Sequence, residues 1–295
     1  MAETQKEELL HKPFPMHRGT ALKSSRISEI TRREFTPIVF LAGATGSGKT
    51  TLLASVYEAF QFAPLAGYSF GGSLTMLGFE EKCFEARARS GSNKTDTPRT
   101  QPKDGQEFFH LRLRGSPSEP FRELLFADMS GEFYERAVNN AAELREKEFE
   151  ILTRCDFLVL LLDGEKLLDP FRRQNVRRDA HTFILRCLEL NLLLPHTVFQ
   201  VMISKWDKVA LRSNEEIKSC KNFVESVFST EILKRPLEVL PIASRPAEYS
   251  AEIGKLYGIK DLFPGWVEAV SPILRPSEPK NINVPAKRMF SRMVL

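Results

Sequence analysis

Short apolar runs separated by longer amphipathic segments recur along the chain from residue 37 onward. The runs at residues 38–42 and 157–162 are apolar at every position. A strand buried on both faces has no polar side, so such runs are typical of central strands in a parallel sheet. The sequence predicts further strands at residues 107–114, 121–127, 197–204 and 237–243, and helices at 50–60, 133–149, 183–194, 214–233 and 259–273.

The alternation of strands and helices predicts an α/β fold. We expect a three-layer domain with a mainly parallel sheet, covered by helices on both faces, and one antiparallel edge strand. The turn residues Gly-Ser-Pro-Ser at 115–118 favour a hairpin between the two strands that flank them. The predicted organisation is an N-terminal arm (1–36), one domain (37–275) with an irregular insert at about 61–106 that contains a short helix near 80–88, and a C-terminal tail (276–295).

Composition narrows the class of protein. Of the 295 residues, 42% are hydrophobic and 27% charged, as in ordinary globular proteins, which removes support for collagen-like or disordered chains. The net charge of +4 is too small to favour nucleic acid as a partner. No apolar run approaches the ~20 residues of a membrane-spanning helix, and the first residues lack a signal-peptide pattern. We therefore expect a cytoplasmic protein without membrane association, its four dispersed cysteines reduced and its five histidines not metal ligands.

Residues 43–50 match the phosphate-binding pattern G-x-x-x-x-G-K-[ST], the P-loop. The match lies between a predicted buried strand and a predicted helix. There, glycines let backbone N–H groups converge on phosphate oxygens, and the helix start adds its positive dipole. Lys49 is predicted to reach the β- and γ-phosphates and Thr50 to bind Mg²⁺. The phosphate-binding candidates in this segment are Gly43, Ala44, Gly46, Ser47, Gly48, Lys49, Thr50 and Thr51.

A second motif, Asp-Met-Ser-Gly, follows the predicted strand at 121–127. An acidic residue at the end of a strand beside the P-loop strand holds Mg²⁺ in P-loop folds, and a glycine there offers its N–H to the γ-phosphate. Asp128 and Gly131 are the residues predicted for these roles. The tetrapeptide is common by itself, and its position after an apolar strand is what makes it informative.

A third motif, Ser-Lys-Trp-Asp at residues 204–207, ends another predicted buried strand. Together the three motifs resemble those of the Ras-like GTPases of the translation-factor class, whose base-reading motif is [NTS]-K-x-D. The resemblance implies that Asp207 accepts hydrogen bonds from guanine while the Lys205 stem covers the ring. Adenine would leave that carboxylate desolvated and unpaired. The resemblance further implies that Ser204 and Ser244, the latter where the family has Ser-Ala-Lys, belong to the guanine site.

The chain departs from that family in two places. The segment before Asp128 is longer, so the threonine that covers Mg²⁺ in the family is assigned here to Thr97, with Thr95 and Thr100 as alternatives. Glu132 stands where Ras-like enzymes have a water-orienting Gln. With the long insert, the run at 126–132 resembles bacterial GTPase domains found alongside a second GTPase in predicted defence gene clusters. That narrower resemblance implies a second GTPase or a protein effector as a partner.

The motifs together predict a P-loop NTPase domain of the GTPase type at residues 37–275. The predicted protein binds GTP/GDP with Mg²⁺ and acts as a switch that hydrolyses GTP slowly, stimulated by a partner, with Lys49 and Glu132 as catalytic residues. Two alternatives stay open. One is a non-hydrolysing guanine-nucleotide-binding scaffold, which the acid at position 132 favours. The other is a P-loop ATPase or kinase in which residues 204–207 have no role.

Overall fold

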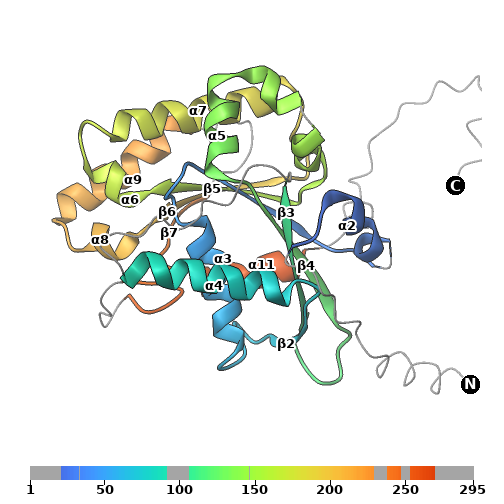
Figure 1. The fold of residues 1–295 in the computed structure, drawn as a ribbon. Helices are drawn as coiled ribbons and strands as arrows, with labels where there is room; N and C mark the ends of the chain where they lie inside the picture. Colours follow the sequence, from blue (N-terminus) through green and yellow to red (C-terminus); the bar gives the residue numbers. More distant parts are fainter. Residues whose placement is uncertain are drawn as a thin grey trace, which may run out of the picture.

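A single seven-stranded sheet forms the centre of the protein. The structure is a computed structural model that describes residues 21–32, 34–91, 106–145, 147–228, 238–246 and 253–269; the expected tail and the first 20 residues of the expected arm lie outside these ranges. Within them the strand order is β2-β3-β4-β1-β5-β6-β7 (Figure 1). The strands are β1 (Ile38–Ala42), β2 (Ser69–Gly72), β3 (Glu107–Arg114), β4 (Arg122–Asp128), β5 (Phe157–Asp163), β6 (Val198–Ser204) and β7 (Glu238–Pro241).

Most of the sheet is parallel, as predicted. β1 pairs in parallel with β4 and β5, and β6 pairs in parallel with β5 and β7. β3 is antiparallel to β4, which confirms the hairpin. The antiparallel strand was predicted at an edge, and this is wrong, because β2 from the insert pairs with the outer side of β3.

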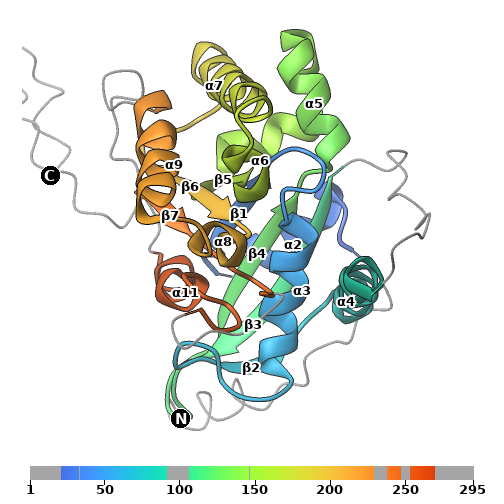
Figure 2. The ribbon, with the colours of Figure 1, turned by 90° about the vertical axis from the view of Figure 1, so that its left-hand side faces the viewer.

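Helices cover both faces of the sheet, which confirms the three-layer α/β architecture (Figures 1 and 2). α3, α4 and α11 cover one face, and α5, α7 and α9 cover the other. In β1, Val39 and Leu41 pack on the first side, and Phe40 and Ala42 on the second. The helices are α2 (Ser24–Thr31), α3 (Lys49–Phe60), α4 (Met76–Gly91), α5 (Gly131–Asn139), α6 (Gly164–Leu168), α7 (Arg173–Glu189), α8 (Trp206–Ala210), α9 (Asn214–Val227) and α11 (Ile259–Val267).

The insert between α3 and β3 is more regular than the sequence indicates. It was predicted as loops with a short helix near residues 80–88, whereas α4 has 16 residues and packs across α3 (Figure 2). Phe79 stacks on Tyr57 of α3 with ring centroids 4.8 Å apart, and the Cys83 thiol lies 3.6 Å from the Ala54 carbonyl oxygen. Burial of Phe79, Cys83 and Ala86 on one side therefore stabilises a helix whose other positions are mostly polar.

The segment before β1 also contains structure. α2 buries Ile27 and Ile30, and Leu22 forms an isolated antiparallel bridge with Phe108 of β3. Residues 22–31 thus pack against the same core as α5 and α7.

The predicted helix at residues 133–149 is wrong in its length. α5 ends at Asn139, and two 3₁₀ segments, Ala141–Arg145 and Lys147–Arg154, follow it. Asn140 has an extended backbone, and its side-chain oxygen accepts a hydrogen bond from the Ala142 N–H at 3.0 Å. An Asn that binds the backbone two residues onward competes with the helix and ends it.

Candidate functional site

The three motifs meet at one edge of the sheet because the strands before them are parallel. The P-loop follows β1, Asp128 ends β4 next to it, and Ser204 ends β6. β6 lies two strands from β1, roughly 10 Å at the usual strand spacing. The edge therefore presents the phosphate-binding motif in its middle, the predicted metal ligand on one side and the predicted base-reading motif on the other.

The P-loop has the backbone that phosphate binding requires. Gly43, Gly46 and Gly48 all have positive φ, at 146°, 81° and 97°. A Cβ at Gly43 would lie 2.5 Å from the Leu161 carbonyl oxygen, so a side chain cannot fit there. No side chain caps the start of α3, and the N–H groups of its first turn, which includes Thr50 and Thr51, are directed toward the loop.

The Lys49 side chain is buried against the P-loop. Its side chain folds back, and Nζ donates to the carbonyl oxygens of Gly43 at 2.6 Å and Ala44 at 3.2 Å. The residue is 7% exposed. An ammonium held against the loop carbonyls lies inside the curve of the P-loop, where a phosphate group would meet it.

The end of β4 approaches the P-loop closely. A Cβ at Gly131 would lie 2.4 Å from the Thr45 backbone nitrogen, so only glycine permits this approach of α5. The Ser130 side chain caps α5 by accepting the Phe133 N–H at 3.2 Å. The Thr45 N–H also faces a carboxylate of α5, Glu135 Oε1, at 3.4 Å. The structure thus places Gly131 beside the P-loop, and Glu132 lies in the first turn of α5.

Asp128 offers an oxygen that suits a metal ion. Its carboxylate is mostly buried, and Oδ1 has no hydrogen-bond partner among the described residues. Mg²⁺ prefers hard oxygen ligands, often one carboxylate with a hydroxyl and phosphate oxygens. The Asp128 carboxylate and the Thr50 hydroxyl fit that preference. Thr97, Thr95 and Thr100 lie outside the described residues, so the assignment of Thr97 to the metal stays a prediction.

The other oxygen of Asp128 faces a lysine that the sequence analysis did not single out. Lys82 of α4 places Nζ 3.7 Å from Asp128 Oδ2 and 3.2 Å from Glu107 Oε2. Burial lowers the pKa of Lys82, but the charges of Asp128 and Glu107 outweigh it, so the pKa lies above its usual value. Lys82 is therefore a buried cation at the predicted metal side of the site.

Ser204 and Lys205 link the end of β6 to its neighbours. The Ser204 hydroxyl donates to the Leu162 carbonyl oxygen at 3.1 Å, and a Cβ at Gly48 would lie 3.6 Å from Ser204 Cβ. Ser204 thus lies against the P-loop but makes its hydrogen bond to β5. Lys205 has a left-handed backbone, with φ 54°, and its Nζ donates to Asp163 Oδ2 at 2.7 Å.

Asp163 and Glu165 are residues of this site that the motifs did not identify. The buried Asp163 caps α6 through hydrogen bonds from the N–H groups of Glu165 and Lys166 and also holds the Lys205 ammonium. Glu165 pairs with Lys205 at 3.4 Å and with Lys208 at 2.9 Å. A carboxylate directly after the apolar run of β5 was the available sequence signal. These contacts fix the Lys205 side chain at the start of α8, and half-buried Asp207 follows in the first turn of that helix.

The segment after β7 lies next to residues 204–207. Trp206 N–H donates to the Ile242 carbonyl oxygen at 3.0 Å, and Ile242 N–H donates to Ile203 at 2.9 Å. The carbonyl oxygen of Ser244 accepts the Leu256 N–H at 3.2 Å. The structure therefore brings Ser244 to the same end of the sheet as Ser204 and Asp207.

Arg245, the next residue, binds buried Glu58 of α3. Lys255 and Arg87 bind the same carboxylate, with nitrogen–oxygen distances of 3.2 and 3.5 Å. Burial raises the pKa of Glu58, but the hydrogen bonds and charges of Arg245 and Lys255 outweigh it, so the pKa lies below its usual value. Glu58 thus joins α3 to the segments on both sides of residues 247–252.

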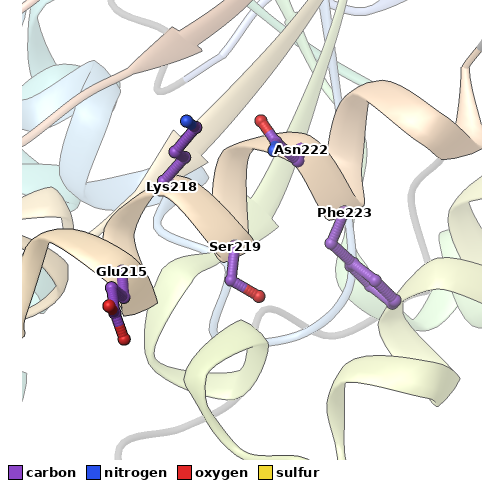
Figure 3. A pocket seen from close by; sticks show the side chains of 5 residues that line it. All are labelled: Glu215, Lys218, Ser219, Asn222 and Phe223. Carbon is purple, nitrogen blue, oxygen red and sulfur yellow. The ribbon is translucent and has the colours of Figure 1, made fainter.

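Other features of the described residues lie away from this edge. A shallow hollow on the outer side of α9 contains none of the motif residues (Figure 3). The hollow is lined by Glu215, Lys218, Ser219, Asn222 and Phe223.

In the described part of the chain, no three His, Cys, Asp or Glu side chains cluster as metal ligands, and no helix is long and apolar enough to cross a bilayer. The four cysteines are free and buried.

A phosphate-binding loop after the central strand, with a carboxylate on the next strand and a further motif two strands away, is the layout of a P-loop nucleotide-binding domain. The family model of Double-GTPase 2 matches residues 37–266, most of the chain. The chain therefore belongs to the Double-GTPase 2 family, and it is a GTP-binding protein of the P-loop GTPase type. No curated protein matches it.

Several solved structures are similar to this chain at low sequence identity. The GTPase-like domain of Ski7 from S. cerevisiae bound to GTP is 14% identical, with a TM-score of 0.44, over 85% of this chain and 54% of that one. The signal recognition particle receptor SRb-GTP/SRX complex from Chaetomium thermophilum is 14% identical, with a TM-score of 0.38, over 74% and 94%. Bacterial selenocysteine-specific elongation factor EF-Sec is 13% identical, with a TM-score of 0.34, over 70% and 25%. The chain spans 25% of that elongation factor, 52% of a mutation variant of SsGBP and 50% of a GTP-binding protein from Sulfolobus solfataricus.

Proposed function

We propose that this protein is a Mg²⁺-dependent guanine-nucleotide switch that hydrolyses GTP slowly by itself. The observation that supports guanine most directly is the position of residues 204–207 at the end of β6, with Ser204 against Gly48 of the P-loop. A base-reading carboxylate on Asp207 needs this proximity, because the base and the phosphates belong to one ligand.

The proposed roles follow from the positions of the side chains. Lys49 and the first N–H groups of α3 would bind the β- and γ-phosphates, and Gly131 would offer its N–H to the γ-phosphate. Thr50 and Asp128 would hold Mg²⁺, which supplies positive charge beside the transferred phosphoryl group. Lys205, fixed by Asp163, would cover the guanine ring, with Asp207, Ser204 and Ser244 around it.

Slow hydrolysis is proposed because of Glu132. An ionised Glu can accept a hydrogen bond from water but cannot donate one to the γ-phosphate, whereas Gln can do both. A partner that supplies an arginine could raise the rate by roughly 10³–10⁵. The proposed partner is a second GTPase, which the family name favours, or a protein effector. The resemblance of the sequence motifs favours a bacterial defence system, and we propose that the protein acts in the cytoplasm.

Competition between nucleotides tests the guanine assignment. GTP and GDP should displace a fluorescent GDP analogue in the presence of Mg²⁺ at least about tenfold more tightly than ATP, a difference of ~1.4 kcal/mol. Asp207→Asn should shift the preference from GTP toward XTP, because the amide donates to the carbonyl that xanthine has in place of the guanine amino group. Asp261→Asn, an exposed acid on α11, is the matched control. Equal affinity for ATP would favour the ATPase or kinase alternative.

Phosphate release separates the switch from a scaffold. Under single-turnover conditions with excess protein, a GTPase releases one phosphate per bound GTP, and a non-hydrolysing scaffold releases none. A protein that binds GTP tightly but leaves it intact would refute the enzymatic part of the proposal and retain the guanine assignment.

A further inference from the structure

A buried lysine of the insert stands beside the predicted metal ligand. The Lys82 side chain is 7% exposed, and its ammonium lies between the carboxylates of Glu107 (3.2 Å) and Asp128 (3.7 Å). Glu107 and Asp128 are directly paired across β3 and β4, so both side chains extend from the same face of the sheet. The ring of Phe109, two residues along β3, lies 5.5 Å from Nζ.

These contacts indicate that the Lys82 side chain is buried as a charged ammonium and not only for its apolar packing. Burying an unpaired ammonium is costly, and two carboxylates with an aromatic face are what offset that cost. The neighbouring positions on the same side of α4, Phe79, Cys83 and Ala86, are apolar or small and pack on the core. A lysine among them is explained by the two acids that it meets.

We propose that Lys82 is an internal competitor of Mg²⁺ for the negative charge of Asp128, and that it thereby sets the metal affinity of the nucleotide complex. The inference rests on the proposed function, since it takes Asp128 as the metal ligand. Lys82 occupies the Oδ2 side, whereas Oδ1 has no partner among the described residues. A divalent ion at Oδ1 would be repelled by the ammonium on the other oxygen, and this repulsion would be weakly screened because Lys82 and Asp128 are both buried.

The position of Lys82 on α4 gives this competition a structural consequence. α4 belongs to the insert at about 61–106, the segment that also contains Thr97, the residue assigned from the sequence to cover Mg²⁺, and Asp128 begins the Asp-Met-Ser-Gly motif. Lys82 therefore connects the two segments through the Asp128 carboxylate, the same group that is proposed to bind Mg²⁺. Neutralising the lysine should strengthen metal binding without changing any residue that contacts the nucleotide or the metal.

A magnesium titration tests the inference. Wild-type protein and Lys82→Met are loaded with a fluorescent GDP analogue, and the Mg²⁺ concentration that gives half of the effect on nucleotide dissociation is measured. The expected result for Lys82→Met is a half-saturating concentration at least about tenfold lower, equivalent to ~1.4 kcal/mol. Lys82→Arg keeps the charge and should behave as the wild type, and Lys260→Met, at an exposed site on α11, should have no effect.

The outcomes separate the inference from the function on which it rests. A Mg²⁺-dependent wild type with an unchanged or weaker titration for Lys82→Met overturns the competition and leaves the proposed function intact. If GDP dissociation from the wild type does not depend on Mg²⁺, both the competition and the proposed Mg²⁺-dependent function are overturned. Lys82→Gln retains a donor for the two carboxylates without a charge, so it replaces the Met variant if that variant does not fold, with the same expected direction.

Discussion

Substitution of Glu58 by Gln should destabilise the protein and alter its response to acid. Glu58 lies on α3 with its side chain 10% exposed and binds Arg245 and Lys255, whose side chains are 19% and 31% exposed. Gln has nearly the same shape but no charge, so the change isolates the electrostatic contribution of the carboxylate. Arg87 is 61% exposed and contributes little to this balance.

The size of the effect follows from the burial of the pair. Two unit charges about 4 Å apart attract each other by ~4 kcal/mol at an effective dielectric constant near 20, before desolvation is subtracted. Removing one partner of a buried pair costs ~3–5 kcal/mol. Arg245 and Lys255 are partly exposed and can regain water in the variant, so we expect a smaller loss, about 2 kcal/mol. For a domain of this size that corresponds to a fall in Tm of roughly 4–8 °C.

The pH dependence has a defined sign. Arg245 and Lys255 hold the pKa of Glu58 below its ordinary value of 4.5. A carboxyl whose pKa is depressed on folding adds stability above its unfolded pKa and loses that stability as the pH falls through the folded pKa. The difference in unfolding free energy between the wild type and Glu58→Gln should thus be constant from pH 6 to 8 and should shrink below about pH 4.5.

Urea unfolding at several pH values measures this difference. Glu215→Gln, at an exposed position of α9, serves as the matched control and should change stability by less than about 0.5 kcal/mol. A Glu58→Gln variant as stable as the wild type at pH 7 would show that desolvation of the carboxylate cancels its ion pairs. A deficit that persists undiminished at pH 4 would show that the charge of Glu58 is not its source.

Two further predictions concern the nucleotide site. Lys49→Ala should remain folded, because the Lys49 ammonium binds the carbonyl oxygens of the P-loop and is not part of the hydrophobic core. In a fluorescence titration the variant should bind GTP at least about 100-fold more weakly, because the phosphates lose their buried cation. A collapse of Tm with GTP affinity retained would assign Lys49 a structural role. Glu132→Gln should leave single-turnover GTP hydrolysis similar or faster, because Gln removes a negative charge near the γ-phosphate and adds a donor. A decrease of more than tenfold at unchanged GTP affinity would make Glu132 the catalytic base.

The central strands and the P-loop could be predicted from sequence because their signals are local. β1 and β5 are apolar at every position before their strand ends, which only a sheet covered on both faces explains. The P-loop is read from eight consecutive residues, and its strand and helix lie directly on either side. The same locality allowed the hairpin of β3 and β4 to be predicted from the turn between them.

The insert and α2 were missed because their stability comes from distant residues. The first eleven residues of α4 contain three buried hydrophobic side chains, which pack in the same core as α3, and the remaining composition resembles a loop. α2 depends on Ile27 and Ile30 reaching the core that α5 and α7 share. The break after α5 depends on one hydrogen bond that the Asn140 side chain accepts from the Ala142 N–H, and the pattern of charged residues at 133–149 does not reveal it.

The contacts of the charged residues that organise the site could not be predicted from the sequence either, because their partners are also distant in the chain. Lys82 meets Glu107 and Asp128, and Glu58 meets Arg245 and Lys255, all far away in the chain. In the sequence, Lys82 and Glu58 are each one more charge on a helix. Only the folded chain brings these partners together, and for Lys82 it does so through the pairing of β3 with β4.

Helix α4 contacts both halves of the site, but with unequal strength. At Lys82 it is joined to the metal side through a buried pair, whereas at Arg87 it is joined to Glu58 through a side chain that is 61% exposed. Screening by water makes the exposed contact weak, and burial makes the other one strong. A displacement of α4 would therefore cost little at Glu58 and would leave Asp128 and Glu107 without their cation. The insert is thus coupled to the metal ligand of the site far more tightly than to the segment that is proposed to recognise guanine.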